Sequence, residues 1–375
     1  MGTSVGPSAG LSPKYQRLIQ RTLRIERQPK LELQNERQQK KDTKSLVSDL
    51  DGKLSSLQSQ LSTLTDTTSS PFDGRNASAA EGTEGFSVSA DETASTGSYS
   101  LAVNRLASED GRVSQKFDAD KSNLSDFFTN NGAQTFSVDV STPTDSNPDA
   151  RTSIDVTVDS DGTNNKEVLS DIQSAIDSAF QSAVDDGTLS ADQRPSASVI
   201  NPTSGTARLS LRSQQTGYQG RLSFSDSSNN LLSELQVNAD QIANDTQGGE
   251  ITEVGTDEAS SKLTSEFELN GLTFTRNSNE VTDAVDGVTM NLEEANGTAS
   301  SFEVTADEEG AQSVVKNFVD RVNEVITFLN EKTNVNPENG ERGELADDST
   351  FRRLSRQLRT DAPRPVEGQP GGPNT

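Results

Sequence analysis

Two stretches of the chain, one near each end, carry apolar residues at alternating three- and four-residue spacing. The first set is Val47, Leu50, Leu54, Leu57, Leu61 and Leu64, and the second is Val315, Phe318, Val322, Val325 and Leu329. This heptad spacing predicts helices that each bury a narrow stripe, the seam, against a partner helix. Because neither stripe is broad enough to stabilise an isolated helix, we expect the two helices to pair with each other as a helical leg.

The residues before the first heptad stripe, 13–44, predict a long and mostly polar helix. Its apolar positions are Tyr15, Leu18, Ile19, Thr22, Leu23 and Ile25. Pro29 lacks a backbone N–H and its ring crowds the preceding turn, so we expect a kink or a restart of the helix there. A solvated helix face is favoured over a specific anionic partner as the interpretation of the many basic residues.

The middle of the chain changes to period-two alternation, which is typical of β-strands. Within residues 113–247, alternating stretches surround an amphipathic helix at residues 168–183. A helix among short strands predicts a small inserted α+β module with one or two lobes. The strongest hairpin signal is Asn270-Gly271, which has alternating apolar residues on both sides. After the second heptad stripe, residues 333–343 predict a polar loop.

A short basic amphipathic segment follows this loop, in which Phe351, Leu354 and Leu358 lie among four arginines. Residues 362–375 are rich in Pro and Gly and are expected to be disordered. The elements together predict an α+β protein with a terminal coiled-coil helical leg and two or three small β-rich head domains, the outer ones inserted. The predicted domains are 1–45, the N-terminal helical leg; 46–112 plus 248–332, a leg-proximal domain of paired heptad helices and β-sheet; 113–247, the inserted outer α+β domain or domains; and 333–375, the loop, short basic helix and tail.

Composition argues against most classes of enzyme. Hydrophobic residues make up 29% of the chain and aromatic residues 5%, which predicts thin cores in an elongated set of small modules. The sequence has no Cys, His or Trp, so disulfides, thiolate sites, His-dependent triads and the usual zinc ligand sets are excluded. The chemistry that remains would use carboxylate pairs, Ser–Lys arrangements or oxygen-ligated metals.

The net charge of −25 is spread unevenly, because residues 1–45 hold ten Lys or Arg against four Asp or Glu. A strongly acidic surface disfavours nucleic acid and anionic membranes and suits a high-salt environment. No apolar run approaches the length of a membrane span, and the N-terminal residues do not have the pattern of a Sec signal peptide. We therefore expect no nucleic-acid partner and no membrane insertion.

For each motif that could carry chemistry, a purely structural interpretation is favoured. The segment Asp159 to Gly162 resembles a calcium loop, but residues 157 and 168 at the anchor positions are Thr and Val, so a β-turn is favoured. Adjacent carboxylates at 307/308 and 347/348 are interpreted as solvated residues of an acidic surface. Asn-x-Ser/Thr patterns, such as those at 76, 244 and 296, are common by chance in such a chain. We predict no catalytic residues, no metal site and no cofactor.

Five segments of the chain, in the same order, resemble motifs of the flagellar cap family, the hook-associated protein 2 or filament-capping proteins. They are Leu18-Ile19 with Ile25 to Pro29, Gly97 to Ala107, Leu269 to Thr289, Phe318 to Asn323 and Gly343 to Arg352. The second is similar to the family's "G-x-Y-x-L-x-V-x-x-L-A" strand, and the last to its "G-x-L-x-G-D-S-T-x-R" segment. Two positions depart from the motifs: Val322 replaces an aromatic residue and Asp347 replaces a glycine.

The resemblance implies a bacterial protein that leaves the cell through the flagellar secretion apparatus without a Sec signal and forms a ring at the filament tip. It implies a leg of paired terminal helices, a domain built from both ends of the chain, and outer domains inserted between them. The implied partners are further copies of the chain, flagellin, hook–filament junction proteins and a flagellar export chaperone. The family usually carries a further C-terminal leg helix, so residues 13–44 are expected either to belong to an incomplete leg or to pair with another subunit.

Three hypotheses for function follow from the residues and the resemblance. The first is a non-enzymatic structural cap that promotes flagellin polymerisation, with Leu18, Ile19, Leu23 and Ile25 as the leg interface. The alternative is a secreted adhesion or glycan-binding module that uses the insertion at 113–247. The third, a carboxylate-based glycosidase, would need a pair of Asp or Glu flanking a glycosidic bond.

Overall fold

A computed structural model describes residues 13–66, 70–144, 146–147, 149–226, 230–338 and 340–361. The predicted disordered tail at 362–375 lies outside the described residues. The chain divides into two compact units, residues 1–74 with 307–375 and residues 75–306, which we call the helical unit and the β unit. The predicted boundaries differ, because they grouped the heptad helices with the sheets, whereas these helices contact each other and the helix at residues 349–361.

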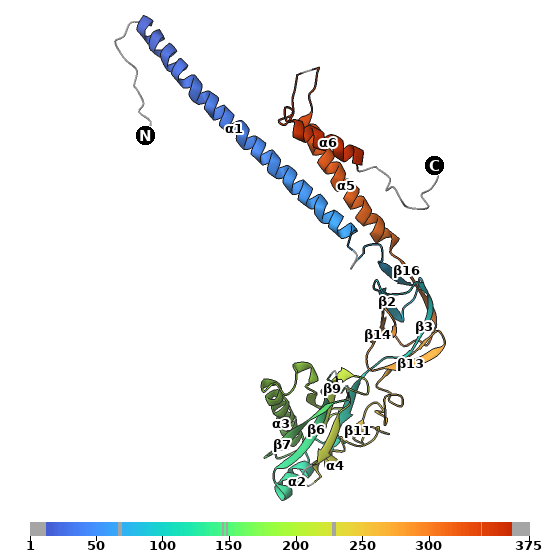
Figure 1. The fold of residues 1–375 in the computed structure, drawn as a ribbon. Coiled ribbons are helices and arrows are strands. Elements are labelled where there is room, and N and C mark those ends of the chain that lie inside the picture. Colours follow the sequence, from blue (N-terminus) through green and yellow to red (C-terminus); the bar gives the residue numbers. More distant parts are fainter. Residues whose placement is uncertain are drawn as a thin grey trace. The chain divides into compact units, whose positions relative to one another are not determined.

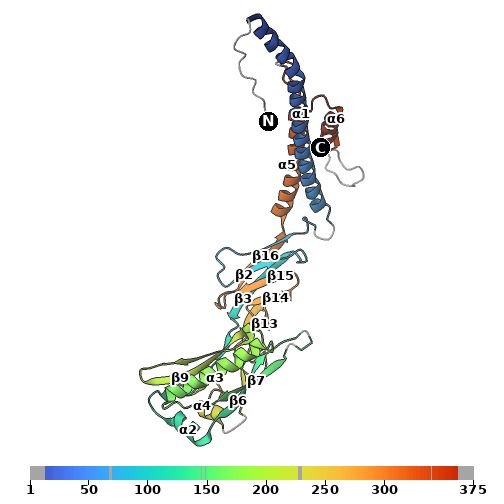
Figure 2. The same cartoon turned by 90° about the vertical axis from the view of Figure 1, so that its left-hand side faces the viewer.

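The helical unit contains three described α-helices: α1 (Pro13–Leu64), α5 (Glu308–Thr333) and α6 (Ser349–Asp361). Both α1 and α6 contact α5 (Figures 1 and 2). The start of α5 is defined by Asp307, whose Oδ1 accepts a hydrogen bond from Gly310 N at 2.9 Å. Glu308 and Glu309 in the first turn and Lys332 in the last turn match the helix dipole.

Of the kink or restart expected at Pro29, the restart is wrong, because α1 is one helix of 52 residues that passes through Pro29. A proline removes one backbone hydrogen bond, at a cost of about 3 kcal/mol. The helix is long enough to continue on both sides of that position.

The β unit begins and ends with a paired-sheet module, residues 75–106 and 264–306. Its five-stranded sheet has the order β1-β16-β3-β12-β13, and its three-stranded sheet has the order β14-β15-β2. The strands are β1 (Arg75–Ala79), β2 (Phe86–Ala90), β3 (Gly97–Arg105), β12 (Ser265–Leu269), β13 (Leu272–Arg276), β14 (Glu280–Val285), β15 (Val288–Leu292) and β16 (Ser300–Ala306). One apolar core joins the two sheets, with Phe86, Phe267 and Phe302 among its buried side chains.

The predicted hairpin at Asn270-Gly271 is confirmed. β12 pairs with β13 so that Phe267 lies opposite Phe274 and Leu269 opposite Leu272. Asn270 and Gly271 have φ values of 51° and 80°. These left-handed conformations are those of a type I′ turn, which Asn-Gly favours.

The inserted module occupies residues 109–250, slightly more than the predicted 113–247. Its sheets have the orders β10-β6-β7 and β11-β4-β9-β5, with β8 also paired to β9. The strands are β4 (Glu109–Val113), β5 (Phe117–Asp118), β6 (Gln134–Ser141), β7 (Arg151–Val158), β8 (Ser196–Ile200), β9 (Thr206–Thr216), β10 (Ser223–Asp226) and β11 (Gly249–Glu250). The helices are α2 (Asn123–Asn131), α3 (Asn165–Asp185) and α4 (Leu231–Leu235), with a 3₁₀ turn, η1 (Ala191–Gln193).

Helix α3 organises the core of the inserted module. It contacts β7, β8 and β9 and lies over the strands in Figure 2. Val168, Leu169, Ile172, Ile176 and Phe180 recur at helical spacing and are fully buried. Asn164 caps the helix, because its Oδ1 accepts a hydrogen bond from Glu167 N at 3.0 Å. The α+β class predicted from the sequence is confirmed by this arrangement of helices and antiparallel sheets.

Candidate functional site

The helical unit holds a small apolar cluster at the contact of its three helices. Leu50 of α1 and Val325 and Leu329 of α5 are buried there. The half-buried side chains around them are Leu54, Leu57, Phe328, Phe351, Leu354 and Leu358. Lys53 Nζ lies 3.8 Å from Glu324 Oε2 and 6.0 Å from the centroid of the Phe328 ring. The cluster therefore joins α1, α5 and α6.

The predicted seam residues fall into two groups in the structure. Leu50, Val322, Val325 and Leu329 are buried, and Leu54, Leu57, Leu64 and Phe318 are half-buried. Val47, Leu61 and Val315 remain more than 40% exposed, so the packed stripe is shorter than predicted. The physical reason is the third helix, because the side chains of α6 pack against the cluster around Leu329 and not around Val315. The sequence showed the signal for this helix, Phe351, Leu354 and Leu358, but not its position.

The first half of α1 presents the predicted leg interface to solvent. Leu18 and Ile25 are 62% and 61% exposed, and Ile19 and Leu23 are 43% and 44% exposed. The described side chains between Pro13 and Ser45 are all exposed. A helix with an apolar stripe gains most of its stability from packing, so this stripe is a candidate contact surface for another helix or subunit.

Carboxylates in the described residues do not gather into a metal site. No group of three or more Asp or Glu side chains there is arranged to hold an ion. In the segment predicted to be a turn, Ser160 Oγ donates a hydrogen bond to Asp171 Oδ2 at 2.6 Å and accepts one from Gly162 N at 3.3 Å. This segment therefore leads into α3. Among the described helices, none has the length and apolar composition needed to cross a membrane.

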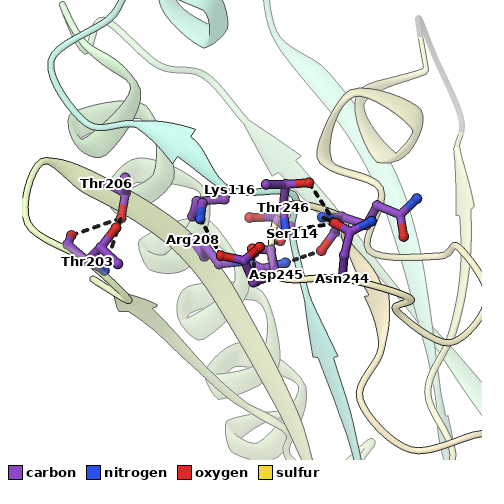
Figure 3. Close-up of polar contacts among 9 residues, drawn as sticks. Ser114, Lys116, Thr203, Thr206, Arg208, Asn244, Asp245 and Thr246 are labelled. Carbon is purple, nitrogen blue, oxygen red and sulfur yellow. Dashed lines mark hydrogen bonds and ion pairs between the residues drawn. The ribbon is translucent and has the colours of Figure 1, made fainter.

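A polar cluster of the inserted module anchors the loop at residues 244–247 (Figure 3). Lys116 Nζ lies 2.7 Å from Asp245 Oδ2, and the hydrogen bond and charge of this lysine lower the pKa of Asp245. Arg208 donates hydrogen bonds to the backbone oxygens of Ser114, Asp245 and Gln247. Thr246 Oγ1 donates to Asn244 Oδ1 at 2.7 Å. Because these groups bind one another, the cluster is an anchor for the loop.

A buried ion pair lies where β4 meets the start of β10. Arg112 Nε lies 2.9 Å from Asp110 Oδ1, and Arg112 Nη1 lies 3.2 Å from Glu250 Oε1. Leu222 N donates a hydrogen bond to Asp110 Oδ2 at 2.8 Å. Burial raises the pKa of Asp110, and Arg112 opposes that shift. The pair ties together strands that are far apart in sequence.

The paired-sheet module and the inserted module are joined by a short turn at residues 276–279. Thr216 Oγ1 donates a hydrogen bond to Asn277 O at 2.6 Å, and Gln219 N donates one to Asn277 Oδ1 at 3.1 Å. Gly217 has a φ of 78°, and a Cβ there would overlap Asn277. Asn279 exchanges two hydrogen bonds with the backbone of Ala107. The inserted module is therefore held by side-chain contacts as well as by its two chain connections.

Comparisons with known proteins point in one direction. Family models described as the flagellar hook-associated protein 2 N-terminus and C-terminus match residues 14–110 and 264–371, together more than half of the chain. The chain is 27% identical over 297 residues to the lateral flagellar hook-associated protein 2 of Vibrio parahaemolyticus, covering 76% of this chain and 57% of that protein. It is 27% identical over 289 residues to the B-type flagellar hook-associated protein 2 of Pseudomonas aeruginosa, covering 73% and 53%.

A solved structure has a similar fold. The D1-D2-D3 domains of the flagellar cap protein FliD from Escherichia coli align with a TM-score of 0.55 at 22% identity, over 84% of this chain and 76% of that one. The chain spans about half the length of the curated relatives described above. The matched segments carry the paired helices of the leg and the paired-sheet module. The chain belongs to the flagellar hook-associated protein 2 family, the flagellar cap proteins.

Proposed function

We propose that this chain is a structural, non-enzymatic subunit of the flagellar cap. It acts outside the bacterial cell, at the tip of the filament, where several copies form a ring that promotes flagellin polymerisation. The observation that carries this proposal is the match of both family models, which cover α1 with the first strands and then the strands and helices after the insertion. The names of the matched relatives support the same role.

The working parts are the seam between α1 and α5 and the exposed stripe Leu18, Ile19, Leu23 and Ile25. A subunit that guides polymerisation needs contacts that form and break repeatedly. Small apolar stripes with a polar rim suit such contacts better than a large hydrophobic patch. We further propose that flagellin, hook–filament junction proteins and an export chaperone are partners, and that the chain is exported by the flagellar apparatus.

The test combines solution mass with flagellin polymerisation. Purified full-length chain is examined by light scattering and then added to flagellin monomers, and filament growth is followed by turbidity. We expect self-association and faster or more regular growth, both reduced by Leu18→Ser/Ile25→Ser. Leu272→Ser is the matched control, because Leu272 is also strongly exposed but lies at the hairpin of the paired-sheet module. A chain that neither self-associates nor changes flagellin growth would contradict the proposal.

The adhesion hypothesis gains no support from the comparisons, which describe flagellar hook-associated and cap proteins. In the inserted module, the polar cluster that anchors the loop at residues 244–247 is internally paired and does not favour adhesion.

A further inference from the structure

A polar groove lies between the end of α5, the loop that follows it and one face of α6. Its volume is about 780 Å³. One side is lined by Asn330, Thr333 and Asn334, and the other by arginines of α6. Ser355, also in the lining, is buried and its Oγ donates a hydrogen bond to Asn330 Oδ1 at 3.0 Å. The groove thus offers hydroxyl and amide groups beside guanidinium groups.

The arginines of the groove are Arg352, Arg356 and Arg359, at spacings that place them on one face of α6. They extend over about 10 Å of the helix axis. Within the described part of the chain, none of the three forms an ion pair with a carboxylate, although Glu331 also lines the groove. By contrast, the neighbouring Arg321, Lys332 and Arg342 each pair with a Glu or Asp. The groove therefore has uncompensated positive charge.

The opposite charge is concentrated in the β unit. Residues 75–306 contain 13 Lys or Arg and 37 Asp or Glu, a net charge of −24 out of the −25 of the whole chain. A second copy of the chain thus supplies many carboxylates, and Arg binds carboxylates through paired hydrogen bonds. At physiological ionic strength, repulsion between the acidic surfaces is largely screened beyond about 8 Å, whereas contact pairs are screened less.

Two other polyanions fit the groove less well. A single-stranded nucleic acid is usually bound by stacking of its bases on aromatic side chains, and none of the residues that line the groove is aromatic. A membrane-binding helix needs a free apolar face, but Phe351, Leu354 and Leu358 of α6 pack against the cluster with α5. The arginines therefore project from a helix whose apolar side is already covered.

We propose that the groove between α5 and α6 is a contact between copies of this chain, in which Arg352, Arg356 and Arg359 bind an acidic segment from residues 75–306 of a second copy. The inference rests on the proposed function, because a cap is built from several copies. It adds the surface and the chemistry of one contact in that ring.

The test compares two double variants of the full chain that change the charge equally. Arg352→Glu/Arg356→Glu reverses two groove arginines, and Lys316→Glu/Arg353→Glu reverses two exposed residues of α5 and α6 that do not line the groove. Circular dichroism checks that both remain folded. Light scattering at about 0.15 M salt, where the screening length is about 8 Å, then gives the dissociation constant for self-association. We expect the groove variant to raise it about tenfold, as expected for the loss of two exposed ion pairs, and the control variant to match the wild type.

Equal weakening by both variants would overturn the inference, because it would show a general effect of charge. Binding of the wild type, but not the groove variant, to phosphatidylserine vesicles would overturn it in favour of a membrane contact. If the groove variant self-associates like the wild type and still promotes flagellin growth, the inference is wrong and the proposed function stands. If the wild type neither self-associates nor affects flagellin, the proposed function fails as well.

Discussion

The inserted module and the helical unit bury very different amounts of apolar surface. The core of the inserted module joins 25 buried apolar residues from two sheets and three helices. The cluster of the helical unit buries three, Leu50, Val325 and Leu329, within the described residues. Stability scales with buried apolar area, so the inserted module is expected to be stable by itself. The helical unit is expected to depend on further helix contacts, which suits the proposed assembly of this unit with other copies.

The largest expected effect is a cavity in the inserted module. Phe180 of α3 is fully buried, so Phe180→Ala should lower the free energy of unfolding by about 4 kcal/mol. The measurement is urea unfolding combined with amide hydrogen exchange, which separates α3 from α5. The exposed residue Leu272 gives the control, since Leu272→Ala should change stability by less than about 0.5 kcal/mol. Faster exchange in α5 alone would contradict the comparison.

A second large effect is expected at the buried ion pair. Arg112→Leu leaves the buried carboxylate of Asp110 without its cation and should cost about 3 kcal/mol. Without Arg112, the pKa of folded Asp110 should rise further above its unfolded value, because the largest of the effects that oppose burial is then lost. The folded state would bind more protons than the unfolded state, so stability falls as pH rises above the unfolded pKa.

The cost of Arg112→Leu should therefore be greatest near neutral pH and shrink as the pH falls toward the ordinary Asp pKa of about 3.9. Urea unfolding across this range measures the trend. The double variant Asp110→Asn/Arg112→Leu removes both charges of the pair and should recover part of the loss. A cost that does not change with pH would show that packing, rather than the unpaired carboxylate, causes it.

The sequence predicted local features better than those set by distant contacts. The hairpin at Asn270-Gly271 follows from turn chemistry within a few residues, and α3 from the helical period of its buried face. The ion pair of Asp110 and Arg112 was not predicted, because its burial depends on Leu222, more than 100 positions away. From the sequence alone, two charged residues in a β-strand are expected to be exposed to solvent; their burial becomes evident only when the strand is placed in its sheet.

In the helical unit, too, the sequence predicted local features better than features set by distant contacts. The heptad spacing indicated which side chains of α1 and α5 face a partner, but it treated the seam as one continuous stripe. Leu329 is buried in the cluster against which α6 packs. Val315 lies outside that cluster and stays exposed. The arginines of α6 were visible in the sequence as a basic amphipathic segment. The groove that they line could not be predicted, because its other side is formed by Asn330 and Asn334, whose position beside α6 is known only from the fold.

A smaller effect is expected for a cavity in the helical unit. Leu329 is fully buried, but its cluster is small and its half-buried neighbours can move inward. Leu329→Ala should therefore cost about 2 kcal/mol, the lower end for such a truncation. Hydrogen exchange should accelerate in α5 and α6 while α3 keeps its protection, because the inserted module has its own core. Equal loss of protection in α3 would show that the two regions unfold as one.

The smallest effect is expected at the surface ion pair of the helical unit. Lys53 Nζ is 3.8 Å from Glu324 Oε2, and both side chains are about one third to one half exposed, unlike Arg112 and Asp110. Glu324 also has a second cation, Arg321, at 3.0 Å. A double-mutant cycle of Lys53→Gln and Glu324→Gln should therefore give a coupling energy below about 0.5 kcal/mol, and less at high salt.

The appropriate measurement for this cycle is urea unfolding of the four proteins at two salt concentrations, followed by the circular dichroism of the helices. A coupling above about 1 kcal/mol, beyond the usual value for exposed pairs, would mean that Lys53 and Glu324 are shielded from water more than in the single chain. A further copy packed against α1 and α5 would provide that shielding, so the coupling should then depend on protein concentration. The same cycle would thus detect assembly through the helical unit while measuring one of its weakest contacts.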